Sequence, residues 1–253
     1  MNTKFCLPKN IFSSILLSEI KDVNSLEAEN IPSSIIAKKI SEDKNSVGLI
    51  PTLDLLSNRE LFVSGEIGIS FNALLSNSYI HYKEEQETID EIFLKGDVTS
   101  NEVILSKILF KEFYDVDIKP TLLRNEPSDF NKNVLIVGDE NFEKELFLNG
   151  LSFAEEIVEL VNAPYVNFVL ASTNETLLRE FNKKYKEYFL NGHEEIFDDL
   201  FPTFPQTSID FISVNAQHLV FDLDEQDLEG IKLLLQLPYY HGLIKNMIDV
   251  KFV

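Results

Sequence analysis

Short apolar runs alternate along the chain with longer amphipathic stretches. A strand that is covered on both faces carries no polar alternation, so each apolar run predicts a buried strand. The predicted strands are residues 5–7, 47–50, 61–69, 78–82, 91–94, 134–137, 165–171 and 250–253. Helices are predicted at 11–20, after Asn30 as a cap, after residue 101, at 153–161, within 173–202 and after Asp224 as a second cap. Alternating strands and helices predict an α/β chain with parallel strands covered by helices.

Sheets of this kind bind ligands in the loops that follow the carboxyl ends of their strands. The loop at residues 99–101 precedes a helix on which Leu105, Leu109 and Phe113 form one apolar stripe. Hydroxyl groups and free backbone N–H groups at a helix start can bind an anion without any arginine. The alternative is that this loop only caps the helix.

Two further loops follow predicted buried strands. Pro51 and Thr52 come directly after strand 47–50, and Gly138 and Asp139 come after strand 134–137. Both are candidate ligand loops for the same topological reason. The alternatives are an ordinary turn at Pro51 and a helix N-cap at Asp139.

The charge of the chain restricts its partners. The 253 residues include 42 acidic and 22 basic ones, a formal net charge of -20. Such a surface repels phosphate backbones and anionic lipids, so neither nucleic acid nor a membrane is expected as a partner. The single cysteine, Cys6, excludes an internal disulfide and a multi-cysteine zinc site, and its apolar neighbours place it in the core.

Common cofactor motifs are absent from the sequence. There is no Walker loop, no G-x-G-x-x-G, no G-x-S-x-G and no H-E-x-x-H, and the four histidines lack ligand spacing. We therefore expect no cofactor and no metal. No apolar stretch approaches the roughly 18 residues of a membrane span, and no signal peptide is recognisable, so a cytoplasmic location is expected.

Several segments, in order along the chain, resemble one enzyme family. Residues 47–52, VGLIPT, are similar to the D-V-A-L-I-P-S segment of the menaquinone-pathway chorismate dehydratases. Residues 96–113 resemble their D-T-x-S-x-T-S loop with the helix behind it, and 135–139 resemble L-L-I-G-D. Further similar segments are 65–70, 150–156, 162–166, 220–224 and 241–244. The resemblance covers most of the chain from about residue 45 to the end.

The resemblance implies a two-lobed, type-2 periplasmic-binding-protein-like fold, in which each lobe is a mixed sheet flanked by helices. One lobe would contain residues 1–76 plus 175–253, and the other the inserted segment 77–174. The ligand, a small anionic molecule, would lie between them. The family are hydro-lyases of the futalosine route, which convert chorismate to 3-[(1-carboxyvinyl)oxy]benzoate without a metal or nucleotide.

The resemblance also implies roles for individual residues. Asn10 would orient or protonate the leaving hydroxyl group and is the candidate catalytic residue. The candidate substrate-binding residues are Pro51, Thr52, Ser70, Thr99, Ser100, Asn101 and Asp139. Two positions depart from the family: Asn10 aligns with the family asparagine only if one residue is deleted, and Glu102 stands where the family has serine. The alternatives are a non-catalytic protein that binds or senses a small carboxylate, and an interaction module. We expect a monomer or a homodimer.

Overall fold

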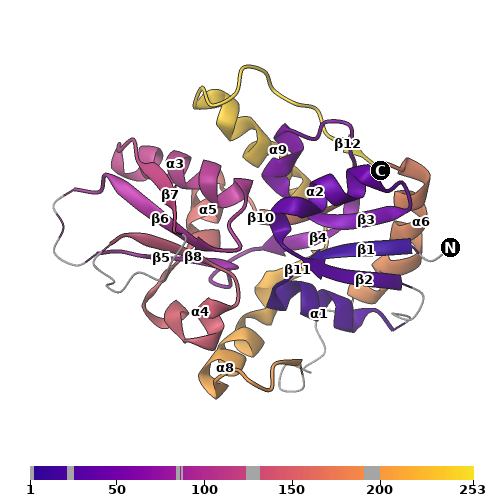
Figure 1. Cartoon of the computed structure of the whole chain (residues 1–253), viewed down its shortest axis with the longest axis horizontal. Helices are drawn as coiled ribbons and strands as arrows, with labels where there is room; N and C mark the ends of the chain where they lie inside the picture. Colours follow the sequence, from indigo (N-terminus) through magenta and orange to yellow (C-terminus); the bar gives the residue numbers. More distant parts are fainter. Residues whose placement is uncertain (1–2, 22–25, 84–85, 87, 124–131, 191–199) are drawn as a thin grey trace.

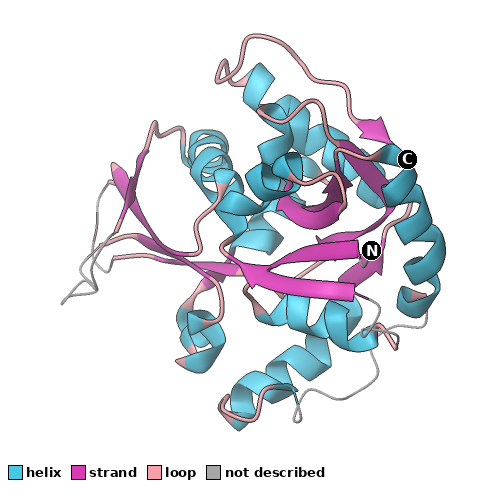
Figure 2. Ribbon diagram, turned by 45° about the vertical axis from the view of Figure 1, so that its right-hand side comes forward, coloured by secondary structure: helices cyan, strands magenta, loops and turns pink. Residues whose placement is uncertain are grey.

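The computed structural model describes residues 3–21, 26–83, 86, 88–123, 132–190 and 200–253. These residues form two lobes, each built on its own sheet (Figure 1). The larger sheet has the strand order β11-β4-β10-β3-β1-β2, with β12 beside β4, and the smaller sheet has the order β7-β6-β8-β5-β9. Helices flank both sheets (Figure 2). The predicted two-lobed α/β architecture is therefore confirmed.

The large lobe contains both ends of the described chain. Its strands are β1 (Thr3–Pro8), β2 (Leu26–Ile31), β3 (Ser46–Pro51), β4 (Phe62–Phe71), β10 (Tyr165–Ser172), β11 (Leu219–Asp222) and β12 (Lys251–Phe252). Its helices are α1 (Ile11–Glu19), α2 (Ser33–Glu42), the 3-10 helix η2 (Thr52–Leu56), α6 (Glu175–Tyr185), η4 (Lys186–Phe189), α8 (Gln206–Asn215), η5 (Ala216–His218) and α9 (Glu225–Tyr240). β1 is parallel to β2 and β3, whereas β10 is antiparallel to β3 and β4, so the sheet is mixed and not purely parallel.

The small lobe is built from the middle of the chain. Its strands are β5 (Ser78–His81), β6 (Glu91–Gly96), β7 (Lys119–Leu122), β8 (Val134–Val137) and β9 (Leu151–Ser152). Its helices are α3 (Ser100–Tyr114), α4 (Glu140–Glu143), η3 (Leu146–Asn149) and α5 (Phe153–Val161). β8 lies parallel to β6 and antiparallel to β5, so this sheet is mixed as well.

Two long strands in the centre of the large sheet connect the lobes. The chain leaves this sheet at the end of β4 and returns to it through β10, and these two strands pair with each other. β10 lies within the segment 77–174 that the resemblance assigned to the small lobe, but its hydrogen-bonded partners β3 and β4 belong to the large sheet. The exact division of the chain between the lobes stays a prediction.

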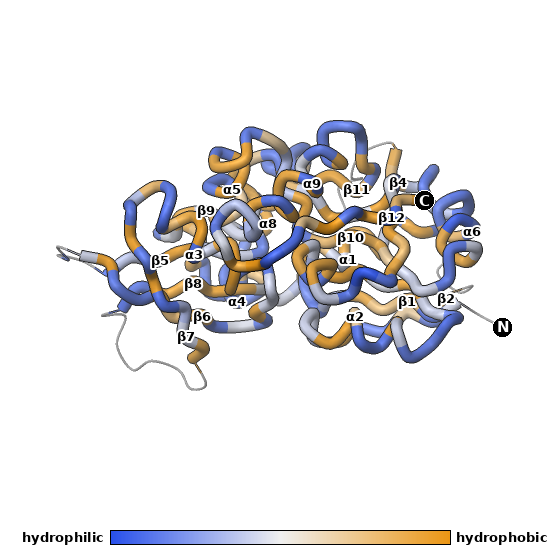
Figure 3. Tube along the Cα trace, turned by 90° about the horizontal axis from the view of Figure 1, so that it is seen from above, coloured by the Kyte–Doolittle hydropathy of each residue, from blue (hydrophilic) through white to orange (hydrophobic). Residues whose placement is uncertain are grey.

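Apolar residues are frequent along the strands of both lobes and along α1 (Figure 3), although β2 is mostly polar between its two ends. Cys6 is fully buried, as expected. Aromatic rings also connect the lobes: Phe12 of α1 packs edge-on against Phe71 at 4.9 Å and against Phe142 of α4 at 6.0 Å between ring centroids. Phe12, Phe71 and Phe142 are fully buried, so the core runs without interruption from one lobe into the other.

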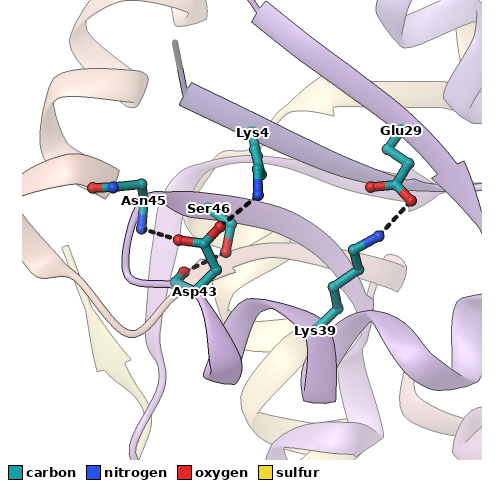
Figure 4. A network of polar contacts seen from close by, with 6 residues as sticks. All are labelled: Lys4, Glu29, Lys39, Asp43, Asn45 and Ser46. Atoms are coloured by element: carbon teal, nitrogen blue, oxygen red, sulfur yellow. Dashed lines mark hydrogen bonds and ion pairs between the residues drawn. The ribbon is translucent and has the colours of Figure 1, made fainter. Parts of the chain in front are cut away.

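Ion pairs hold α2 against the edge of the large sheet (Figure 4). Lys4 of β1 donates to Asp43 at the end of α2 over 2.9 Å, and Lys39 pairs with Glu29 of β2. Exposed pairs of this kind contribute little stability, typically about 0–1 kcal/mol. They mark where the second half of α2 meets β1 and β2, whereas its first residue, Ser33, faces the small lobe.

Some sequence-based expectations differ from the structure. Asn30 does not cap a helix but lies in β2, a strand that carries buried residues only at its two ends and therefore lacks a strand-like pattern. Pro32 is the N-cap of α2 instead. Phe113 is 38% exposed, whereas Leu105 and Leu109 are buried, so the apolar stripe of α3 ends one turn earlier than predicted. Asp224 caps α9 as predicted. Residues 191–199 of the predicted helical segment lie outside the described residues.

Candidate functional site between the lobes

Three helices of the large lobe begin at the same edge of its sheet. α1, α2 and η2 follow β1, β2 and β3, which are parallel, so their first N–H groups lie at the carboxyl ends of neighbouring strands. These helix starts face the small lobe, and each of them receives a side chain from it. Backbone N–H groups at a helix start carry partial positive charge and attract anions. This edge is therefore the candidate site.

Unpaired donors lie at the start of α1. Asn10 is the N-cap, and its Oδ1 accepts a hydrogen bond of 2.9 Å from the backbone N–H of Ser13. Asn10 and Ser13 are only 4% and 1% exposed, yet Asn10 Nδ2 and Ser13 Oγ find no partner among the described residues. Buried polar groups in native proteins are almost always hydrogen-bonded. Two unpaired donors beside a helix start are therefore suited to a bound anion.

Asp139 reaches the same helix start from the small lobe. It follows β8 through Gly138, which adopts a φ of +101°, and its Oδ1 accepts a hydrogen bond of 2.9 Å from the backbone N–H of Ile11. Asp139 occupies the N-cap position of α4, but its side chain makes no capping bond there. Burial raises the pKa of the Asp139 carboxyl group to about 6. The site thus contains a carboxyl group that titrates near neutral pH.

Asp97 contacts the start of α2, and it was not among the predicted site residues. Ser33 donates from its backbone N–H to both carboxylate oxygens of Asp97, over 3.1 and 3.0 Å, and from its hydroxyl group over 2.5 Å. Asp97 follows Gly96, which has a φ of +95° and whose Cβ, if present, would lie 1.9 Å from the carbonyl oxygen of Val137. Only glycine fits at position 96.

Thr99 belongs to the cap of α3. Its backbone N–H and hydroxyl group donate to Glu102 Oε2 over 2.8 and 2.6 Å, and the hydroxyl oxygen accepts from the backbone of Asn101. Glu102 is fully buried, and burial raises the pKa of its carboxyl group. These contacts form a capping box, which matches the simple-cap alternative for Thr99.

Ser100 and Asn101 bridge the lobes. The Ser100 hydroxyl group donates to Asp54 of η2 over 2.7 Å. Asn101 accepts from the backbone N–H of Leu53 over 2.9 Å and donates to Asn167 of β10 over 2.9 Å. In this form of the molecule the polar atoms of both side chains thus contact protein groups, and a role in ligand binding stays a prediction.

The remaining predicted site residues are buried in the large lobe. Thr52 donates to the carbonyl oxygen of Val166 over 2.5 Å, and Ser70 donates to Asp227 of α9 over 2.5 Å. Pro51 is the buried N-cap of η2. The structure therefore brings Asn10 and Asp139 together at α1, and Pro51, Thr52, Ser100 and Asn101 together at η2. Ser70 faces α9 instead.

Three further findings concern metal sites, cavities and membrane-spanning helices. Within the described residues, no group of three or more His, Cys, Asp or Glu side chains could hold a metal ion. A hollow of about 520 Å³ lies in the small lobe beside Tyr82, Ile89 and Tyr114, and none of the predicted site residues lines it. No helix in the described part of the chain is long and apolar enough to cross a membrane.

Comparisons with known proteins identify the fold. No model of a protein family matches the chain, and a search of curated proteins finds no match. Protein AF1704 from Archaeoglobus fulgidus superposes with a TM-score of 0.64 at 13% identity, over 95% of this chain and 98% of that one. The alkanesulfonate-binding protein SsuA from Xanthomonas axonopodis pv. citri, bound to MOPS, gives 0.64 at 12% identity, over 99% and 97%. The periplasmic aliphatic sulphonate binding protein SsuA from Escherichia coli gives 0.62 at 11% identity, over 98% and 90%. The chain therefore has the two-lobed α/β fold of the type-2 periplasmic binding proteins.

Proposed function

We propose that this protein binds a small anionic molecule between its lobes, at the start of α1. The observation that carries the proposal is the pair of buried, unpaired donors Asn10 Nδ2 and Ser13 Oγ beside the first turn of that helix. Two structural neighbours with the same fold are named as sulphonate-binding proteins. A carboxylate or a sulphonate would supply acceptor oxygens for these two unpaired donors.

Donor groups at the start of α1 can bind an anion even though the chain as a whole is strongly acidic. A net charge of -20 gives no long-range attraction for an anion. Local donors act at hydrogen-bond distance, however, and in a buried site they are screened far less than surface charges. The side-chain amide of Asn10 and the hydroxyl group of Ser13, beside the positive end of a helix, can therefore hold an anion in an acidic protein.

Calorimetric titration with chorismate, succinate and ethanesulfonate tests the binding proposal. Saturable binding of at least one of these anions is expected, and Ser13→Ala should weaken it. Ser18→Ala is the matched control, because Ser18 lies on the same helix and its hydroxyl group already donates to Ile15 over 2.7 Å. Equal affinities in the two variants, or no binding to any of the three anions, would contradict the proposal.

The finer proposal is a chorismate dehydratase-like reaction. It is supported by the arrangement at the start of α1. The backbone N–H of Ile11, the residue after Asn10, donates to Asp139, and burial raises the pKa of the Asp139 carboxyl group to about 6. A carboxyl group with a pKa near neutrality can act as both acid and base at physiological pH. In this proposal Asp139 protonates the leaving hydroxyl group while Asn10 Nδ2 donates a hydrogen bond to the same oxygen.

The proposed step balances without a further reagent. The C–O bond to the hydroxyl group breaks and one water leaves with the proton from Asp139. The carboxylate so formed takes the proton from the ring carbon, which restores the acid and gives the aromatic product. Mass spectrometry of pure protein incubated with chorismate should detect 3-[(1-carboxyvinyl)oxy]benzoate above the uncatalysed background. Binding of chorismate without this product would support the non-catalytic binding or sensing alternative.

A further inference from the structure

The hollow of about 520 Å³ in the small lobe lies far from the edge where the two lobes meet. α3 begins at that edge with Ser100 and ends at the hollow with Tyr114, and its 15 residues separate the two places by about 21 Å. Along β5, Ser78 pairs with Val137 beside the interlobe loop, whereas Tyr82, which follows β5, lines the hollow. The hollow is therefore separate from the candidate site at α1.

Two tyrosine rings form one wall of this hollow. The rings of Tyr82 and Tyr114 meet edge-on at 6.5 Å between centroids, and their hydroxyl groups share a hydrogen bond of 3.2 Å. Phe110, which is fully buried, packs against both rings, at 6.2 and 5.5 Å. Tyr114 is 44% exposed, so part of its ring stays open to a ligand. The wall is thus aromatic, held in place from behind and accessible.

The remainder of the hollow is apolar and firmly held. Ile89 and Val116 line it together with Gln86. The Gln86 amide exchanges two hydrogen bonds with the side chain of Asn133, over 3.0 and 2.9 Å, which ties this part of the rim to the start of β8. Pockets that hold small molecules have volumes of roughly 300–1,000 Å³ and are mostly apolar with a few polar groups. The hollow has both properties.

The charge around the hollow is negative. Asp90 lines it, and no Lys, Arg or His is among the described residues that do so. Burial raises the pKa of the Tyr82 hydroxyl group, and the nearby carboxylate of Glu156 adds to the rise. The whole chain carries a formal net charge of -20, which attracts cations over long range and repels anions. Unlike the start of α1, this hollow therefore favours a positively charged ligand.

We propose that the hollow binds a small organic cation, with an alkylated ammonium group against the rings of Tyr82 and Tyr114 and the Asp90 carboxylate as its counter-charge. The faces of aromatic rings attract cations, and aromatic walls of this kind recognise quaternary ammonium groups. The methyl groups of such a ligand also suit the apolar side chains of Ile89 and Val116. This site goes beyond the proposed function and does not rest on it.

Calorimetric titration with choline chloride tests the proposal, and 3,3-dimethylbutan-1-ol is the matched probe. This alcohol has the shape of choline but carries a neutral carbon in place of the charged nitrogen. Saturable binding of choline with a Kd on the order of 1 mM is expected for so small a ligand. The alcohol should bind at least about tenfold more weakly. Equal affinities for the two probes, or no binding of choline, would overturn the proposal.

Variants at Tyr114 locate the bound cation. Tyr114→Leu keeps an apolar side chain but removes the ring, so the Kd of choline should rise about tenfold. Tyr114→Phe keeps the ring and loses only the hydrogen bond to Tyr82, so it should bind choline as the wild type does. Tyr240→Leu, at a 67% exposed position of α9, is the control. Equal affinities in Tyr114→Leu and Tyr114→Phe would overturn the proposal.

Asp90 tests the counter-charge, and it provides the answer even if Tyr114→Leu does not fold. Asp90→Asn should raise the Kd of choline about threefold, as expected for an exposed ion pair. Affinity for the alcohol should not change. Asp210→Asn removes the same charge from an exposed position of α8 and should leave both affinities as in the wild type. Equal losses of choline affinity in the Asp90 and Asp210 variants would overturn the proposal, because net charge alone would then explain the binding.

The cation site and the anion site proposed at α1 fail separately. Ser13→Ala and saturating ethanesulfonate should both leave the Kd of choline unchanged, because the hollow is about 21 Å from the interlobe edge. A loss of choline affinity in Ser13→Ala would place the cation at α1 and overturn the proposal for the hollow. If choline binds but no anion does, the cation site stands and the proposed function fails.

Discussion

Asp139 accepts a hydrogen bond of 2.9 Å from the backbone N–H of Ile11, although the two residues are 128 positions apart and belong to different lobes. Burial raises the pKa of the Asp139 carboxyl group to about 6, and the carboxylates of Glu143 and Asp97 add to the rise. The N–H of Ile11 and the charge of Lys9 act in the opposite direction. The lobes thus meet at a group whose charge changes near neutral pH.

Anion affinity is expected to depend on pH through Asp139. A bound anion adds negative charge beside this carboxyl group and raises its pKa above the value of about 6 in the free protein. The complex therefore binds a proton more tightly, so affinity rises as the pH falls from about 8 toward about 6 and levels off below that. Titration calorimetry across this range measures the effect.

The control for this prediction is Asp139→Asn, in which the neutral amide removes the titration. Affinity in that variant should be nearly independent of pH, whereas Asp117→Asn, at an exposed position of the same lobe, should behave as the wild type. A pH dependence that persists in Asp139→Asn would assign the titration to another group.

Asn10→Ala should affect both stability and binding, for two separate reasons. The variant loses the N-cap bond from Ser13, which costs about 1 kcal/mol of folding free energy. It also loses the unpaired Nδ2 donor that is proposed to bind the anion. Asn174→Ala is the matched control, because Asn174 caps α6 through the same type of bond, to Leu177 at 3.2 Å. Both variants should lose similar stability in urea denaturation.

Only Asn10→Ala should lose affinity for a bound anion, by about tenfold, the loss expected for one buried hydrogen bond to a charged group. If the dehydratase proposal holds, turnover of chorismate should fall far more than affinity. Equal anion binding by the Asn10 and Asn174 variants would mean that Asn10 serves only as a helix cap.

The framework of the fold could be predicted from the sequence because each element has a local signal. Residues 134–137 and 165–171 are continuous apolar runs, and both are buried strands in the structure. The cap at Asp224 has an equally local cause, since the partners of its side chain, Gln226 and Asp227, lie within three residues.

The site was only partly predictable, because its contacts join distant parts of the chain. Asp97 and Ser33 are 64 positions apart, and nothing near either residue indicates the other. The predicted loop at residues 99–101 does lie between the lobes, but its hydroxyl groups meet Glu102 and Asp54. A local pattern shows which groups can donate a hydrogen bond, whereas the acceptor they meet depends on how the lobes close.

Gly96→Ala should strongly destabilise the protein. Position 96 has a φ of +95°, and a Cβ there would lie 1.9 Å from the carbonyl oxygen of Val137, which is backbone and cannot rotate away. We expect a loss of at least about 2 kcal/mol in urea denaturation. Gly242→Ala is the control, because Gly242 also has a positive φ, of +67°, but its Cβ would meet nothing within 4 Å. A loss confined to about 1 kcal/mol in both variants would show that the contact with Val137 relaxes.

Glu102→Gln should change how stability depends on pH. Burial raises the pKa of the Glu102 carboxyl group above its ordinary value of 4.5, so the folded state binds this proton more tightly than the unfolded state does. The stability that this group contributes is therefore fully present below about pH 4.5 and is lost as the pH rises through the folded-state pKa.

Glutamine carries no charge at any of these pH values, and its amide oxygen can still accept from Thr99. The variant should therefore lose less stability than the wild type between about pH 5 and about pH 8 when the free energy of unfolding is measured in urea. Glu159→Gln, at an exposed position of α5, should follow the wild-type curve. Parallel curves of unfolding free energy against pH for wild type and Glu102→Gln would contradict this prediction. They would mean that Glu102 stays charged in the folded core, although a charged, buried carboxylate with one unpaired oxygen is energetically unfavourable.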